Sequence, residues 1–238
     1  LNMKQTSILA ATLSPLLLVA SCGASGSGDS AQTQGAAQAG DWDGEFAITE
    51  HGSFAEPWAA AFIPGTQMLF VTEKAGSAKI VNTANDRQLD VTGLPAVDYG
   101  GQGGLGDVAF LPSESDNSVG TRTIYLTWAE AGDGDTRGAA LGRGQLVCAQ
   151  ATACQIEGLE IIWRQAPKVT GRGHYSHRIA FSPDGEHIFL ASGERQKMEP
   201  SQDEQSHLGK IVRLELDGTP AGDGAIDGAL PDIWSMGH

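Results

Sequence analysis

Alternation of apolar and polar residues with a period of two is the clearest pattern along the chain. Val212, Leu214 and Leu216 lie two positions apart, with the charged residues Arg213 and Glu215 between them. This period predicts a β-strand with one buried face. After residue 40, no segment of ten or more residues shows a convincing helical period without Gly or Pro. The pattern therefore predicts an all-β protein.

A short motif, Ala-Phe-x-Pro, occurs three times. It occupies residues 61–64, 109–112 and 180–183. Each copy is followed by a turn and then an apolar stretch, which predicts strands at 68–72, 123–128 and 187–191. Units of roughly 50 residues are typical of the four-stranded blades of a β-propeller. A β-sandwich would give no reason for the motif to return at this spacing, so we predict a β-propeller.

The length of the chain limits the number of blades. Its 238 residues leave room for about four blades of this period after residue 40, the last without its closing strands. Because propellers usually close into a full ring, we expect residues 41–238 to be a truncated portion of a larger propeller.

The first forty residues have a different composition. Lys4 precedes a mainly apolar stretch that ends just before Cys22, which is typical of a secretion signal. Small residues before the cysteine are similar to the bacterial lipoprotein box. We therefore predict a lipoprotein signal peptide over 1–21, lipidation of Cys22 and a flexible Gly/Ala/Ser/Gln tether over 22–40. The alternative is an ordinary secretory signal with a chance cysteine.

This segment and the charge of the chain indicate location and partners. The longest apolar run, 16–20, is far shorter than the roughly 20 residues of a transmembrane helix. We expect an exported protein, held only by its lipid to a bacterial membrane and facing the periplasm or the cell exterior. With 15 Lys and Arg against 29 Asp and Glu, the net charge is −14. A surface of this sign repels phosphate backbones, so nucleic acid is excluded as a partner.

Two cysteines follow the predicted tether. Cys148 and Cys154 would lie in an oxidising compartment after export, where a small disulfide loop is favoured. Free thiols are the alternative. A zinc site is not indicated, since no further cysteine is available and the nearest histidine is twenty residues away.

Two loops carry candidate chemistry. Residues 101–106 match G-x-G-x-x-G, but a short apolar stretch and Pro112 follow in place of a helix. This context predicts a tight loop between blades and not a dinucleotide site. His174 lies in a second loop, opened by Gly171 and Gly173. An imidazole there is a candidate general base, although many loop histidines are plain surface residues. No residue is predicted to ligate a metal.

Several stretches, taken in order, resemble the soluble glucose/sorbosone (aldose sugar) dehydrogenases that use pyrroloquinoline quinone (PQQ). They include GGQGGLGDVAF and GHYSHRIAF. The matching residues are 68–73, 100–110, 173–181, 206–214, 217–220 and 233–238. The resemblance covers about residues 41–238 and implies a six-bladed propeller with the quinone in the mouth of its channel.

The resemblance also implies an activity and its residues. His174 matches the catalytic histidine, which removes the proton of the sugar's anomeric hydroxyl while hydride passes from C1 to the quinone. Gln102 matches a glutamine that hydrogen-bonds the quinone, and Arg178 matches the arginine that closes the histidine motif, here taken as a cofactor-binding residue. The expected reaction is oxidation of aldoses to lactones, with Ca²⁺ as a second cofactor and an unidentified electron acceptor.

The chain departs from the family pattern at two places. Ser176 and His177 replace a usual Gly-Ser. We expect the added β-carbon to tighten the loop and His177 to add a second titratable group beside the base. Further quinone and Ca²⁺ ligands of the family follow the position of residue 238, so a protein of these residues alone is expected to be inactive. The alternatives are a non-catalytic propeller that binds a carbohydrate or a protein, and a hydrolase such as a lactonase.

Overall fold

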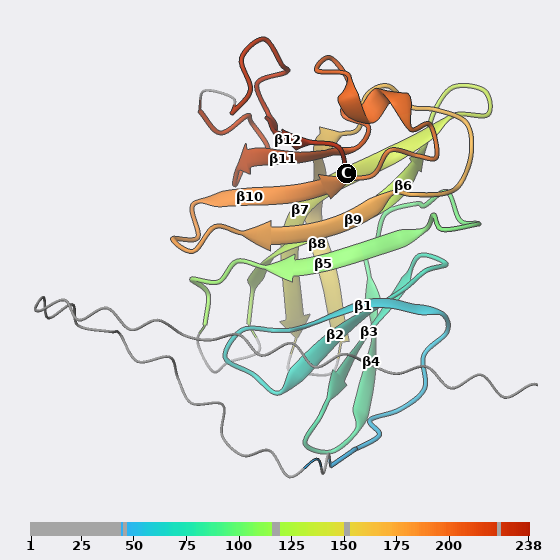
Figure 1. Cartoon of the computed structure of the whole chain (residues 1–238). Coiled ribbons are helices and arrows are strands. Elements are labelled where there is room, and N and C mark those ends of the chain that lie inside the picture. Colours follow the sequence, from blue (N-terminus) through green and yellow to red (C-terminus); the bar gives the residue numbers. More distant parts are fainter. Residues whose placement is uncertain (1–43, 45–46, 116–119, 150–152, 223–224) are drawn as a thin grey trace, which may run out of the picture. The chain divides into compact units, whose positions relative to one another are not determined.

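In the part of the chain that the computed structural model describes, the strands pair into one eight-stranded and one four-stranded sheet, and the larger sheet divides into two groups of four (Figure 1). The structure describes residues 44, 47–115, 120–149, 153–222 and 225–238, and Thr49–His238 forms one unit. The first blade contains β1 (Pro57–Phe62), β2 (Met68–Glu73), β3 (Ser77–Asn82) and β4 (Arg87–Thr92). The second contains β5 (Leu105–Phe110), β6 (Arg122–Ala131), β7 (Arg137–Ala149) and β8 (Ala153–Arg164). The third contains β9 (Ser176–Phe181), β10 (His187–Ser192), β11 (Lys210–Glu215) and β12 (Ile233–Met236), with a 3₁₀ turn at Glu199–Gln202.

The first strand of each blade is its innermost strand. Within a blade, neighbouring strands pair antiparallel in chain order, and β5 contacts both β1 and β9 (Figure 1). This arrangement confirms the predicted all-β propeller. The described residues form three blades where the length allowed about four. The reason is that β6, β7 and β8 have 10, 13 and 12 residues, so the second blade uses much more chain than the first.

The Ala-Phe-x-Pro motif has the same place in all three blades. Phe62, Phe110 and Phe181 are the last residues of β1, β5 and β9. The motif therefore marks where each innermost strand ends, and its proline starts the turn that leads to the second strand. The motif's unequal spacing reflects the lengths of the strands that follow.

The core has two parts, one on each side of the second blade. On β6, Ile124, Leu126 and Trp128 belong to the cluster shared with the first blade. Tyr125 and Ala129 point the other way, into the cluster shared with the third blade. All five residues are buried. Alternation in this strand therefore separates two cores and does not mark a solvent face.

A threonine joins each of the first two blades to the next one. The hydroxyl of Thr72 accepts the N–H of Ala59 at 3.0 Å and donates to the carbonyl of Gly106 at 2.8 Å. In the second blade, the hydroxyl of Thr127 accepts the N–H of Asp107 at 2.8 Å and donates to the carbonyl of His177 at 3.0 Å. We call each of these threonine hydroxyls, with its two hydrogen bonds, a threonine latch. Both latches lie where the pairing of the innermost strand shifts register, so each satisfies backbone groups that a bulge leaves unpaired.

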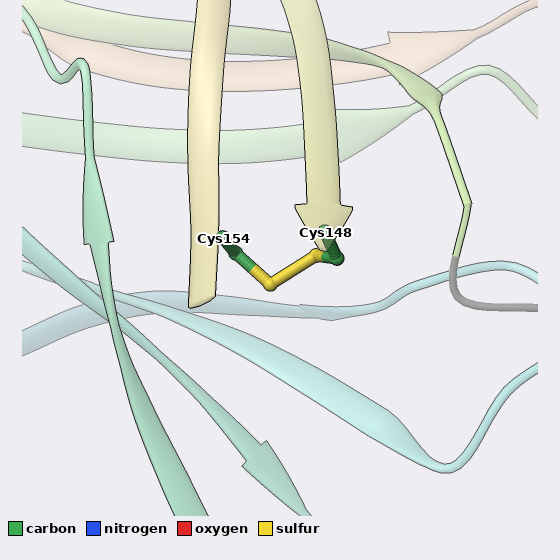
Figure 2. Close-up of a disulfide and its surroundings, with 2 residues drawn as sticks. All are labelled: Cys148 and Cys154. Atoms are coloured by element: carbon green, nitrogen blue, oxygen red, sulfur yellow. A yellow bond between two sulfur atoms is a disulfide. The ribbon is translucent and has the colours of Figure 1, made fainter. Parts of the chain in front are cut away.

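Two further sequence predictions concern covalent features. The structure joins Cys148 and Cys154 by a disulfide between the end of β7 and the start of β8 (Figure 2). The predicted signal peptide, the tether and Cys22 lie outside the described residues. Within the described part of the chain, no helix is long and apolar enough to cross a bilayer.

Candidate active site

The candidate site is built on two loops with unusual backbone conformations. One precedes β9 and contains His174; the other follows β10 and contains Glu194. Six non-glycine residues in these loops and at the start of β9 have positive φ angles. They are His174 (48°), Ser176 (65°), His177 (71°), Arg195 (59°), Gln196 (58°) and Met198 (59°). Such conformations cost free energy and persist where the surroundings hold them, which is common at active sites.

The two loops lie in direct contact. Gly193 donates its N–H to the carbonyl of Tyr175 at 3.1 Å, and a β-carbon at Gly193 would overlap the carbonyl oxygen of His174. Only glycine allows this approach, which brings the chain that follows β10 against the histidine loop.

A pocket of about 450 Å³ opens at this contact. It is lined by Trp58, Gln102, His174, Tyr175, Ser176, Gly193, Glu194 and His238. Trp58 comes from β1, Gln102 from the loop before β5, and His174 from the loop before β9. The innermost strands of three blades, or the loops that enter them, therefore contribute to one pocket.

His174 and Glu194 form an imidazole–carboxylate pair. The Nδ1 atom of His174 contacts Oε1 of Glu194, and the histidine side chain is half exposed. Burial opposes ionisation of Glu194, but hydrogen bonds from His174 and from the N–H groups of Met198 and Lys197 outweigh it and lower the pKa of this carboxyl. An ionised Glu194 accepts the Nδ1 proton, so the network assigns the free lone pair of His174 to Nε2.

Gln102 ties the glycine-rich loop to the histidine loop. The side-chain oxygen of Gln102 accepts the backbone N–H of His174 at 2.7 Å. The backbone N–H of Gln102 donates to the carbonyl of Arg172 at 2.7 Å. Since the side-chain oxygen is used in this way, the side-chain NH₂ group of Gln102 is left to act as a donor. The structure thus places two of the predicted site residues, His174 and Gln102, in one pocket and in direct contact.

Arg178, the third predicted residue, lies apart from that pocket. It is on β9, its side chain is 76% exposed, and its guanidinium is 3.5 Å from the carboxylate of Asp107. It is not one of the residues that line the pocket. A role for Arg178 in cofactor binding stays a prediction.

His177 does not lie beside the base, and that expectation was wrong. Its neighbour Ser176 faces the pocket, whereas alternation along β9 turns the ring of His177 into the core, where the residue is 1% exposed and stacks on Tyr175. Burial and the positive charge of Arg195 lower the pKa of His177 to about 3. The ring is therefore neutral and adds no charge near His174.

Sequence reasoning missed two residues of the site. Glu194 lies in a polar stretch between Gly193 and Arg195, and it was not selected from the sequence. Trp58 gave no signal, because it belongs to the first blade and reaches the pocket only through the fold.

A propeller that presents an imidazole–carboxylate pair in a pocket can take a proton from a bound hydroxyl group. The sequence profile of the family described as "Glucose / Sorbosone dehydrogenase" matches residues 54–238. The chain belongs to this family, which confirms the predicted family membership.

Relatives and solved structures agree with this assignment. The aldose sugar dehydrogenase YliI of Escherichia coli (strain K12) is 31% identical over 184 residues, which cover 76% of this chain and 47% of the relative. The apo-form of the soluble aldose sugar dehydrogenase from Escherichia coli superposes with a TM-score of 0.67 at 30% identity, covering 77% of this chain and 51% of that one. The PQQ-bound aldose sugar dehydrogenase from Streptomyces coelicolor gives 0.63 at 26% identity, covering 78% and 52%. The chain spans about half the length of these relatives.

Proposed function

We propose that the protein oxidises aldose sugars at the anomeric carbon to lactones, with PQQ as the hydride acceptor. The observation that carries this proposal is the His174–Glu194 pair in the pocket. Family membership and the aldose sugar dehydrogenases among the relatives support the same reaction class.

The chain's own residues would handle the proton. Nε2 of His174 accepts the proton of the anomeric hydroxyl, because Nδ1 is occupied by Glu194. The carboxylate holds the ring in this tautomer and stabilises the imidazolium that forms. Removing the hydroxyl proton relieves the positive charge that develops at C1 as hydride leaves.

The residues of the pocket fit part of a quinone site. When bound, PQQ would supply the redox chemistry by taking up the hydride. The amide group of Gln102 can donate to a carbonyl or carboxylate oxygen, and the indole of Trp58 offers an apolar wall. A relative solved in a PQQ-bound form supports this cofactor. For Ca²⁺, the described residues offer no cluster of three or more His, Cys, Asp or Glu side chains, so we name no ligand and derive no step through this ion.

The non-catalytic alternative rested on the altered Ser176–His177 pair. Because His177 lies in the core, this change leaves the pair formed by His174 and Glu194 in place. We therefore do not favour a pure binding module. The proposal includes export and lipid attachment at Cys22, which rest on the sequence alone.

A dye-reduction assay tests the function. The full-length gene product, given PQQ, Ca²⁺ and an aldose, should reduce a redox dye, and His174→Ala should lower turnover by about 10²- to 10⁴-fold because the general base is lost. His51→Ala is a matched control, since His51 pairs with Asp86 in the first blade. Full dye reduction by the His174→Ala protein would remove this residue from the mechanism. Absence of a saturable absorbance change on titration with PQQ would remove the cofactor.

A further inference from the structure

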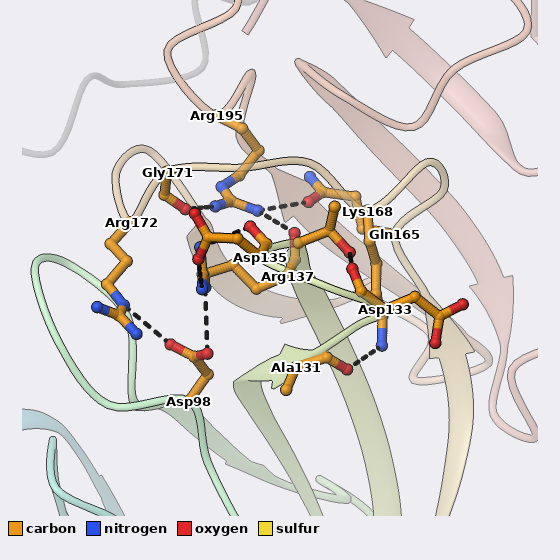
Figure 3. Close-up of polar contacts among 11 residues, drawn as sticks. Asp98, Ala131, Asp133, Asp135, Arg137, Gln165, Lys168, Gly171, Arg172 and Arg195 are labelled. Carbon is orange, nitrogen blue, oxygen red and sulfur yellow. Dashed lines mark hydrogen bonds and ion pairs between the residues drawn. The ribbon is translucent and has the colours of Figure 1, made fainter.

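We infer that Arg195 is a positioning residue for His174: its buried guanidinium holds the backbone that leads into the base and packs on the ring of the residue after it. Arg195 is only 1% exposed. Its Nη2 atom donates to the carbonyl of Gly171 at 2.6 Å (Figure 3), and its Nε atom donates to the carbonyl of Gly173 at 2.8 Å. These carbonyls belong to the segment that leads into His174.

Two more contacts of Arg195 reach the base itself and the residue after it. The backbone N–H of Arg195 donates to the carbonyl of His174 at 3.2 Å. The guanidinium lies over the ring of Tyr175, 3.6 Å from its centroid, in the geometry of a cation–π contact. One residue therefore contacts four of the five residues from Gly171 to Tyr175.

Arg195 also follows Glu194 directly in the chain, so its N–H bond to the carbonyl of His174 joins the backbone beside Glu194 to that of the base. His174 and Arg195 both have positive φ angles, 48° and 59°, and neither conformation is favourable without support. The contacts of Arg195 supply that support. They keep Nδ1 of His174 against the carboxylate of Glu194.

The contacts of Arg195 with residues 171–175, here called the frame, are also connected to the second blade. The Nη1 atom of Arg195 donates to the backbone carbonyl of Arg137 on β7 at 2.8 Å (Figure 3). The side chain of Arg137 donates to Asp98 at 3.1 Å, and Asp98 also pairs with Arg172 at 3.1 Å. Since the carbonyl of Arg172 accepts the N–H of Gln102, the same frame reaches the second polar residue of the pocket.

A lysine could not replace this arginine. The planar guanidinium serves carbonyls in several directions while it stacks on a ring, whereas an ammonium is a compact point charge on a flexible stem. Arg195→Lys should keep the charge and lose the geometry. A purely electrostatic role would survive this substitution, and a positioning role would not.

The test compares the His174 ring in the wild-type protein and in Arg195→Lys, in the full-length gene product. Long-range ¹H–¹⁵N spectra, assigned with His174→Gln, report which ring nitrogen carries the proton. We expect the Nδ1–H tautomer in the wild type and a substantial Nε2–H population in Arg195→Lys. The kinetic part rests on the proposed function: kcat should fall about tenfold to 100-fold, with KM for the sugar changed much less.

Arg164→Lys is the matched control, because Arg164 is half exposed and pairs with Glu130 on the blade surface. It should leave both readouts unchanged. If Arg195→Lys does not melt cooperatively, Arg195→Gln, which retains a planar donor group, takes its place. An unchanged tautomer and an unchanged kcat in a folded Arg195 variant would overturn the inference, as would an Nε2–H tautomer in the wild type. If the wild type oxidises no sugar, the proposed function fails, while the tautomer comparison still decides the role of Arg195.

Discussion

A β-carbon at Gly106 would lie 2.8 Å from Cγ of His177. The innermost strands of the second and third blades thus approach so closely that the imidazole of one occupies the space of a side chain on the other. The contact is buried on both sides, so each residue restricts what the other can be.

We predict that Gly106→Ala lowers the free energy of unfolding by about 1–3 kcal/mol, because its β-carbon would crowd both the ring of His177 and the hydroxyl of Thr127, each 2.8 Å away. His177→Ser makes room, so the double variant should lose clearly less than the sum of the single losses. Urea unfolding of the four proteins measures the coupling. Additive losses would show that the two residues are energetically independent.

The buried ring of His177 predicts a dependence of stability on pH. Its pKa is lowered from 6.5 to about 3 in the folded protein, so below pH 6.5 the unfolded chain binds a proton that the folded chain does not. Stability is therefore lost as the pH falls from about 6.5 towards 3, by at most ~1.4 kcal/mol per pH unit from this group.

The variant His177→Gln isolates that contribution. Its unfolding free energy, measured across the same pH range, should fall less steeply on the acid side than that of the wild type. Parallel curves for the two proteins would contradict the low pKa of His177.

The threonine latch between the second and third blades can be removed by Thr127→Val. The substitution leaves the N–H of Asp107 and the carbonyl of His177 without their partner, at a cost of about 1–3 kcal/mol for buried polar groups. Thr83→Val is the control, since its hydroxyl bonds an exposed carbonyl. A loss in Thr127→Val no larger than in the control would mean that the latch contributes little to stability.

Ser176 has a φ angle of 65°, where glycine is favoured over residues with a β-carbon. Ser176→Gly should raise the free energy of unfolding by up to about 1 kcal/mol, since relief of strain outweighs the added flexibility of the unfolded chain. Thermal melts with Ser182→Gly as the comparison, a substitution in an exposed turn, would test this. A lower melting temperature for Ser176→Gly would contradict the prediction.

Glu194→Gln should lower kcat by about 10²-fold or more, because an amide fixes the tautomer of His174 poorly and does not stabilise an imidazolium. The substitution conserves shape, so sugar binding should change little. Steady-state kinetics separate the two effects. An unaltered kcat would show that Glu194 is not the partner of the base.

Much of the fold could be predicted from local patterns. The Ala-Phe-x-Pro motif marks the end of each innermost strand, and alternation located β11 and much of β6. The number of blades could not be predicted. Phe110 and Phe181 are 71 positions apart, and no local pattern shows that this stretch holds one long blade and not two short ones. The burial of His177 was also missed. It follows from β9 beginning at Ser176, which turns the next side chain into the core, and the sequence did not show where the loop ends and the strand begins.

The site was predictable where one motif carries it. His174 and Gln102 were identified from their own loops. The residues that complete the arrangement come from other parts of the chain: Glu194 from the turn after β10 and Trp58 from β1. Only the packing of three blades brings them to one pocket, so the pattern within any single segment could not predict that they meet.

The parallel pairing of β4 with β8 has a consequence for self-association. Val91 and Thr92 pair with Cys154 and Gln155, so the end of the first blade's outer strand is covered by its neighbour. The disulfide closes the hairpin at that same point. Unpaired strand edges can recruit other chains into shared sheets, and here the cross-linked hairpin withholds such an edge from solvent.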